Sequence, residues 1–161
     1  MMSEVNLSRR GFLKSFGALA AAAVVAPTML VKLQPSDLER LFAMMKTGIV
    51  ENQTFFFREP ITIGFNNLII RGCRFIFDCP HRMGAAITLN GSGLLMEYCD
   101  IDCGPVGADY GIEVLPQSEA DMTSTIQSAI STLSRGTGTE RALAFGAGTY
   151  LVNSPLLVYR T

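Results

Sequence analysis

Residues 61–77 read ITIGFNNLIIRGCRFIF and residues 87–103 read ITLNGSGLLMEYCDIDC, so the chain carries one pattern twice, and Ile61 recurs as Ile87. Identical residues, or residues of the same apolar character, recur through both copies without a gap. A period of about 20 to 50 residues is typical of stacked units that cannot bury an apolar face alone. Because apolar and polar residues alternate within each copy, the repeated unit is predicted to contain β-strands. We therefore expect a β-solenoid in which the second copy stacks on the first.

Charged residues on the outward face test this register independently. If the copies stack directly at the inter-strand spacing of about 4.8 Å, Arg71 lies beside Glu97. The same register places Arg74 beside Asp100. Opposite charges in such cross-strand positions stabilise by roughly 0.2 to 1 kcal/mol when exposed, whereas like charges destabilise. Both pairs are opposite in sign, so they favour stacking in register.

Composition narrows the class of protein. The chain has 161 residues, a formal net charge of -1 and 17% charged residues. This length suits one modest domain, and a near-neutral balance without a polybasic stretch argues against a nucleic-acid or anionic-membrane partner. The sequence has no phosphate-binding glycine loop, no dinucleotide fingerprint and no Ser-His-Asp order, so we expect no cofactor.

The N-terminal segment, residues 1–34, holds the most specific motif. It combines paired arginines, nearby apolar residues and a lysine ahead of an alanine-rich run: Arg9, Arg10, Phe12, Leu13 and Lys14. This pattern resembles the twin-arginine (Tat) export signal, and the apolar run is shorter than the roughly 20 residues that span a membrane. The resemblance implies that the twin-arginine translocase exports the folded chain to the periplasm or beyond. The alternative is that this segment anchors the chain in a phage virion.

Elements on both sides of the repeat extend the predicted solenoid. Ser36 and Glu39 form a capping box before an amphipathic helix, and Gly48 supplies its stop. A helix in this place is expected to cap the open edge of the first coil. Residues 54–57 are expected to form a first partial coil, and residues 111–114 repeat the strand pattern after the second copy.

The C-terminal segment shows a second resemblance. From Asp121 we predict a helix containing IQSAI, then a short strand, GAGTYLV and an S-P-L strand at 154–158. This order resembles the entry segment of right-handed parallel β-helices of the pectate-lyase superfamily, which includes phage tailspikes. The fold expected is mainly β, a short right-handed parallel β-helix of about three coils with a capping helix, then a second helix and strands. The chain is divided into residues 1–34, 35–116 and 117–161.

Carboxylates on the outer face are the candidate catalytic groups. Members of the resembled superfamily that cleave polysaccharides use such groups as general acid and base, or with Ca²⁺ and a basic residue. Asp100 and Asp102 point the same way along one strand, about 7 Å apart. Such pairs are more often part of a solvated face, and no catalytic motif of the family matches them. They are therefore weak candidates, and a non-catalytic module is preferred.

The four cysteines allow three interpretations. Cys73 and Cys99 face inward and are expected to form a short ladder of buried thiols. Cys79 and Cys103 could form a disulfide after export to an oxidising compartment. Their spacings, together with His81 on a turn, are not those of zinc sites, so a metal is the least favoured interpretation.

Two apolar surfaces predict association. Residues 154–158 would form a terminal strand with unpaired backbone groups and an apolar tip at Leu156, Leu157 and Val158. Ile69 and Leu95 face outward and stack into a second apolar stripe. We therefore expect a homo-oligomer, with a trimer implied by the tailspike resemblance, or a place inside a larger assembly.

These features favour an exported or virion-associated binding or assembly module that contacts polysaccharide. The alternative is the N-terminal portion of a polysaccharide lyase, hydrolase or tailspike whose active coils lie beyond residue 161.

Replacing Arg9 and Arg10 with lysine is expected to leave the protein in the cytoplasm, because the translocase reads the arginine pair. Cell fractionation followed by immunoblotting measures this. Unchanged periplasmic or extracellular yield would contradict the twin-arginine assignment and favour the virion anchor.

Overall fold

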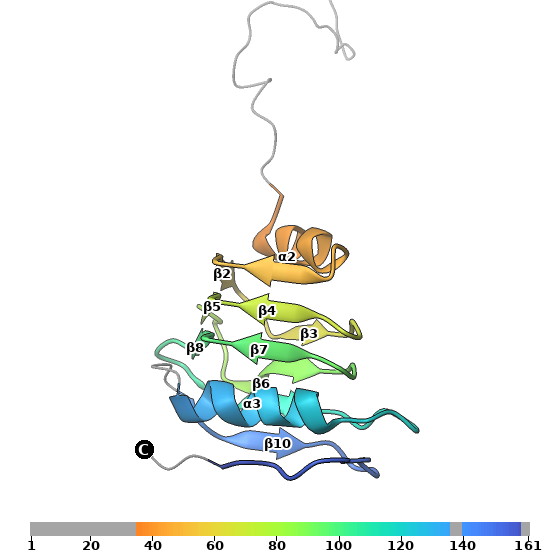
Figure 1. Ribbon diagram of the computed structural model, residues 1–161. Helices are drawn as coiled ribbons and strands as arrows, with labels where there is room; N and C mark the ends of the chain where they lie inside the picture. The colour runs from red at the N-terminus through yellow and green to blue at the C-terminus, as the bar shows by residue number, and fades with distance from the viewer. Residues whose placement is uncertain (1–34, 136–139, 159–161) are drawn as a thin grey trace, which may run out of the picture. The chain divides into compact units, whose positions relative to one another are not determined.

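The computed structural model describes residues 35–135 and 140–158, and residues Ser36–Thr161 form one compact unit. This unit contains strands stacked on one another, with helix α2 beside the first strands and helix α3 beside the last (Figure 1). The elements are α2 (Asp37–Met45), β1 (Ile49–Glu51), β2 (Thr54–Phe57), β3 (Ile61–Ile63), β4 (Ile69–Arg71), β5 (Arg74–Phe77), β6 (Met83–Leu89), β7 (Leu95–Glu97), β8 (Asp100–Asp102), β9 (Ala108–Val114), α3 (Thr123–Arg135) and β10 (Leu143–Phe145).

The strands form three open sheets in which every pairing is parallel. Their orders are β1-β4-β7, β2-β5-β8 and β10-β9-β6-β3. Ile61 pairs with Ile87 and Ile69 with Leu95, which confirms the predicted register of the two copies. The mainly-β class, the parallel strands and the two helices are therefore confirmed. The three sheets are open, so the right-handed parallel β-helix stays a prediction.

The structure also tests the strands predicted outside the repeat. Thr54 pairs with Arg74, so residues 54–57 form a preceding strand, as predicted, although the first round of chain is shorter than the second. Ile112 pairs with Ile87, which confirms the strand predicted at 111–114 and extends it back to Ala108. One strand of each sheet thus comes from each of three successive stretches of chain.

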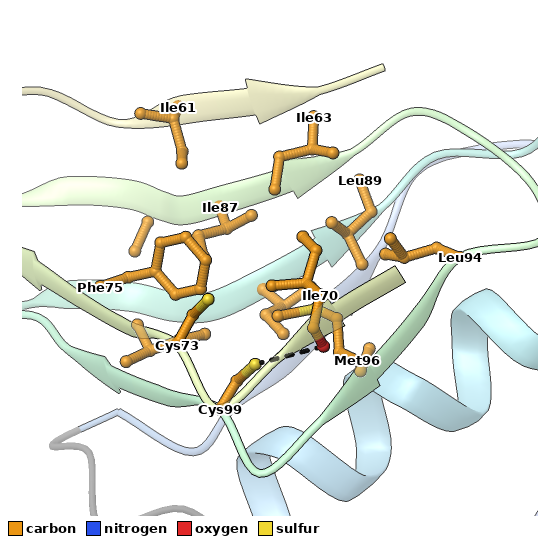
Figure 2. Packing of buried hydrophobic residues seen from close by; sticks show 14 of the residues in the cluster. Ile61, Ile63, Ile70, Cys73, Phe75, Ile87, Leu89, Leu94, Met96 and Cys99 are labelled. Atoms are coloured by element: carbon orange, nitrogen blue, oxygen red, sulfur yellow. Dashed lines mark hydrogen bonds between the residues drawn. The ribbon is translucent and has the colours of Figure 1, made fainter. Parts of the chain in front are cut away.

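Inward-facing side chains stack into one core between the sheets. The rings of Phe55 and Phe75 lie 5.8 Å apart and both are fully buried. Figure 2 shows Cys73 and Cys99 in the same interior, together with the isoleucines of β3 and β6. Burying a large apolar side chain contributes about 1.5 to 3 kcal/mol, so the alternation of apolar residues in the sequence determines which face of each strand points inward.

Helix α2 covers the free edge of β2 through its side chains. Ser36 caps the helix by accepting a hydrogen bond from the Glu39 amide at 3.1 Å, as the capping-box pattern predicts. The Phe56 amide donates to Asp37 Oδ2 at 2.6 Å, and Arg40 donates to the Thr54 carbonyl at 3.0 Å. Charged helix side chains therefore pair with backbone groups that would otherwise face solvent along an open strand edge.

Helix α3 does the same for the free edge of β7, but with hydroxyl groups. The Leu94 amide donates to Thr125 Oγ1 at 3.1 Å. Ser128 Oγ accepts from the Met96 amide at 2.9 Å and donates to the Leu94 carbonyl at 3.2 Å. The two side chains lie one helical turn apart on one face of α3, so they occupy the positions that a further strand would fill.

The C-terminal residues correct one prediction. Residues 154–158 do not form a strand. The Leu157 amide donates to Gln127 Oε1 at 2.7 Å, and Gln127 Nε2 donates to the Leu157 carbonyl at 2.9 Å. Leu156 packs against the core, whereas Leu157 and Val158 are 58% and 74% exposed. The apolar tip is therefore partly covered, and its backbone at Leu157 is paired through a side chain of α3.

Replacing Ser128 with alanine is expected to lower the free energy of unfolding by about 1 to 3 kcal/mol, because two backbone groups at β7 lose their partner. Urea denaturation of the full chain measures this. Ser134→Ala is the matched control, since it makes the same change of helix propensity on the same helix. An equal effect of both substitutions would show that the Ser128 hydroxyl does not cap the strand.

Candidate binding groove

A groove with a volume of about 780 Å³ lies between α3 and the strands β7 and β8. This volume falls within the range of about 300 to 1,000 Å³ that is usual for ligand sites. Within the described part of the chain, β7 and β8 are the last strands of their sheets, and β10 continues only the third sheet. The groove therefore occupies the place where two sheets end and the helix replaces the next strands.

The corner between β7 and β8 lines this groove. One repeat earlier, the Gly72 amide donates to the Glu97 carbonyl at 2.8 Å and the Cys73 carbonyl accepts from the Asp100 amide at 3.0 Å. The equivalent groups in the next copy of the repeat are the amide of Tyr98 and the carbonyl of Cys99, and both residues line the groove. The wall of the groove is thus the edge at which two parallel sheets end within the described residues.

Thr132 lies on the helix side of the groove, and its hydroxyl is buried without a partner. It follows Thr125 and Ser128 on the same face of α3, and it is 6% exposed. Its Oγ1 is the one buried side-chain nitrogen or oxygen without a hydrogen-bond partner in residues 35–135 and 140–158. A buried hydroxyl in this state costs about 1 to 3 kcal/mol. The Thr132 hydroxyl therefore marks a position where the packing of α3 leaves a polar group unsatisfied beneath the wall of the groove.

Tyr98 stands at the corner between β7 and β8, 88% exposed and with a φ of 55°. The equivalent positions one and two repeats earlier are Gly72 and Asn52, at φ values of 63° and 54°. Glycine and asparagine tolerate this left-handed region, whereas other residues pay roughly 1 to 2 kcal/mol. Because the Tyr98 ring gains almost no burial in return, its strain indicates a role outside folding.

The predicted charge ladders lie on the outer face beside the groove. Arg71 lies between two carboxylates, 3.8 Å from Glu97, as the register predicts, and 3.4 Å from Glu51 of the preceding strand. Arg74 pairs in register with Asp100, and its guanidinium lies 3.6 Å from Asp102. All of these side chains are partly exposed, so each contact contributes little to stability.

The two candidate catalytic carboxylates have different surroundings. Asp102 accepts a hydrogen bond from the Gly104 amide at 3.0 Å in addition to its contact with Arg74. Asp100 lines the groove, and Asp102 is not among the lining residues. The structure therefore brings Asp100 together with Glu97 and Tyr98 in the groove, and it assigns Asp102 to the outer charge ladder.

The four cysteines are buried in the core as thiols, with no disulfide among them: Cys73, Cys79, Cys99 and Cys103. Cys99 donates to the Ile70 carbonyl of the preceding repeat at 3.6 Å (Figure 2), and Cys73 donates to the Val50 carbonyl at 3.7 Å. Burial raises the pKa of the Cys99 thiol to about 11 and also raises that of Cys73, so both stay protonated and unreactive at neutral pH. His81 is exposed. In the described ranges no three His, Cys, Asp or Glu side chains are grouped to hold a metal ion.

The remaining predicted residues are those of the outer apolar stripe and of the N-terminal signal. Ile69 and Leu95 are stacked as predicted, with Ile49 of β1 joining the same outer stripe. Leu95 is 37% exposed and lines the groove, so the stripe leads into it. The signal residues 9–14 fall in residues 1–34, which lie outside the described residues.

Comparison with known proteins finds no matching family model, no matching curated protein and no matching solved structure. The site is therefore described from its residues and their geometry.

The sequence predicted α3 and the strands of the second copy, but it did not predict that they face one another across a groove. A signal for this contact was the spacing of hydroxyl residues at Thr125, Ser128 and Thr132, which repeats at helical period among apolar residues. The signal for Tyr98 was the position before each ladder cysteine, where glycine in the first copy becomes tyrosine in the second. Both patterns can be interpreted as features of a groove only once the structure shows that α3 lies against β7.

Replacing Tyr98 with glycine is expected to leave the free energy of unfolding unchanged or to raise it by up to about 1 kcal/mol, because the left-handed strain is relieved and little burial is lost. Urea denaturation measures this. Tyr110→Gly within β9 serves as the control and is expected to destabilise. A clear loss of stability in Tyr98→Gly would show that Tyr98 is a structural residue.

Proposed function

We propose that this protein is an exported or virion-associated module that binds polysaccharide in the groove between α3 and β8, and that it does not cleave its ligand. The supporting observation is the groove itself, which combines the strained, exposed ring of Tyr98 with the carboxylates of Glu97 and Asp100. Aromatic rings with one polar end and a small number of polar side chains are the usual components of a site for a polar organic ligand.

The fold proposed for this module is a short right-handed parallel β-helix. The succession β1-β2-β3, β4-β5-β6 and β7-β8-β9 supports this, since each round adds one strand to each of three parallel sheets. The resemblance of residues 121–158 to entry segments of the pectate-lyase superfamily and of tailspikes supports the same fold. Each round then adds a layer, and α2 and α3 close the strand edges at either end.

A binding role is favoured over catalysis by the carboxylates. Paired acid and base groups must face one substrate, but Asp102 is held by the Gly104 amide beside Arg74, while Asp100 lines the groove. The binding role therefore uses Asp100 as a hydrogen-bond acceptor and requires nothing of Asp102.

The alternative, the N-terminal portion of a polysaccharide lyase, hydrolase or tailspike, is favoured by the apolar side chains exposed near α3 and β10. Phe145, Leu157 and Val158 are more than half exposed there. Further coils or another copy of the chain would cover them, and exposed apolar groups gathered in one region are typical of contact surfaces.

Export through the twin-arginine translocase is proposed from the motif at residues 9–14. Among the described residues, no helix is long and apolar enough to cross a membrane. A homo-oligomer or a virion assembly is proposed from the exposed apolar side chains near the C-terminal end and from the outer stripe of Ile69 and Leu95.

Polysaccharide binding is tested with the purified full chain by affinity electrophoresis in gels containing galactomannan, pullulan or polygalacturonate. At least one polysaccharide is expected to retard the protein. Tyr98→Gly should abolish the retardation, and Tyr110→Phe should leave it intact, because Tyr110 lies on β9 outside the groove. Unretarded wild-type protein, or equal retardation of Tyr98→Gly, would contradict the proposal.

A further inference from the structure

The charges that line the groove discriminate between classes of saccharide. Three carboxylates line it, from Glu97, Asp100 and Asp121, against the single guanidinium of Arg135. Asp121 accepts hydrogen bonds from the amide and hydroxyl of Thr123, which lower the pKa of its carboxyl group, so it is ionised at neutral pH. An anionic ligand therefore meets an excess of negative charge along the groove.

Two of these carboxylates flank the exposed aromatic ring. Glu97 precedes Tyr98 in the chain and Asp100 follows two positions later, and all three residues line the groove at this corner. Carboxylate oxygens accept hydrogen bonds and cannot donate them, and bonds from hydroxyl groups to carboxylates are short and strong. A sugar ring offers hydroxyl donors at its rim and a C–H face that can pack against an aromatic ring. The corner thus fits a ligand rich in hydroxyl groups and free of acidic groups.

A uronic-acid residue placed at this corner would bring a third carboxylate next to Glu97 and Asp100. Like charges about 4 Å apart repel by about 1 kcal/mol in water and by about 4 kcal/mol near a protein surface of lower dielectric. Arg71 offsets part of the charge of Glu97 from the outer face, at 3.8 Å. Arg71 also forms an ion pair with Glu51 and does not line the groove, so it is not placed to contact a ligand there.

We propose that the ligand of this groove is a neutral saccharide, with one sugar ring packed on Tyr98 and its hydroxyl groups donating to Glu97 and Asp100. This inference rests on the proposed function and narrows its substrate class. It also separates this site from one built for polyuronates, in which basic side chains would have to face the ligand carboxylates.

Tyrosine emission of the full chain tests the inference directly, because the sequence has four tyrosines and no tryptophan. The probes are a pool of neutral hexasaccharides of glucose, galactose, mannose and N-acetylglucosamine, and separately hexagalacturonate, at low and matched ionic strength. The neutral pool is expected to change the emission of the wild-type chain, and Tyr98→Gly should remove the change. Hexagalacturonate is expected to bind at least about tenfold more weakly than the neutral pool.

The substitution Asp100→Asn tests whether this carboxylate contributes to the preference for a neutral saccharide. The variant is expected to bind the neutral pool more weakly. The ratio of its affinity for the neutral pool to its affinity for hexagalacturonate should fall several-fold. Asp78 is an exposed carboxylate outside the groove, so Asp78→Asn should change neither quantity. Hexagalacturonate binding as tightly as the neutral pool would overturn the inference while saccharide binding stands. If no hexasaccharide binds, the inference and the proposed function both fail.

Discussion

Free strand edges are the constraint on which the rest of this structure depends. A stack of parallel strands leaves unpaired amides and carbonyls at each end, and these groups must find partners or remain open to other chains. At the first end, Asp37 and Arg40 of α2 pair with the backbone of β2. At the last end, Thr125 and Ser128 of α3 pair with the backbone around β7. Side chains of the two helices therefore act in place of the missing strands.

The groove arises because this replacement is incomplete at the α3 end. A straight helix can follow one strand but cannot follow the corner at Tyr98, where the chain turns from β7 into β8 with a positive φ. The hydroxyl series on α3 continues to Thr132, whose Oγ1 has no partner within the described part of the chain. The same geometry that protects β7 thus leaves the side chains of Tyr98 and Asp100 lining a groove beside β8.

The residues of the interior and those of the outer face are explained by different interactions. Inside, the stacked phenylalanines and the protonated thiols of Cys73 and Cys99 are explained by packing alone. Outside, the ladder of Glu51, Arg71 and Glu97 is explained by the alternation of charge between successive strands. Tyr98 fits neither explanation, since it is exposed and occupies a conformation better suited to glycine. Because neither packing nor charge pairing explains a tyrosine at this position, Tyr98 is the residue that supports the proposed binding site.

The sequence by itself determined the strands, their parallel stacking and their register, because burial of alternate side chains and pairing of opposite charges are local consequences of the repeat that sets Ile61 beside Ile87. It also determined both helices through their caps and apolar faces. Only the tertiary structure decided that α3 lies against β7, that residues 154–158 form no strand, and that Arg74 contacts Asp102. These outcomes depend on contacts between residues far apart in the chain or on side-chain orientation, and neither follows from periodicity.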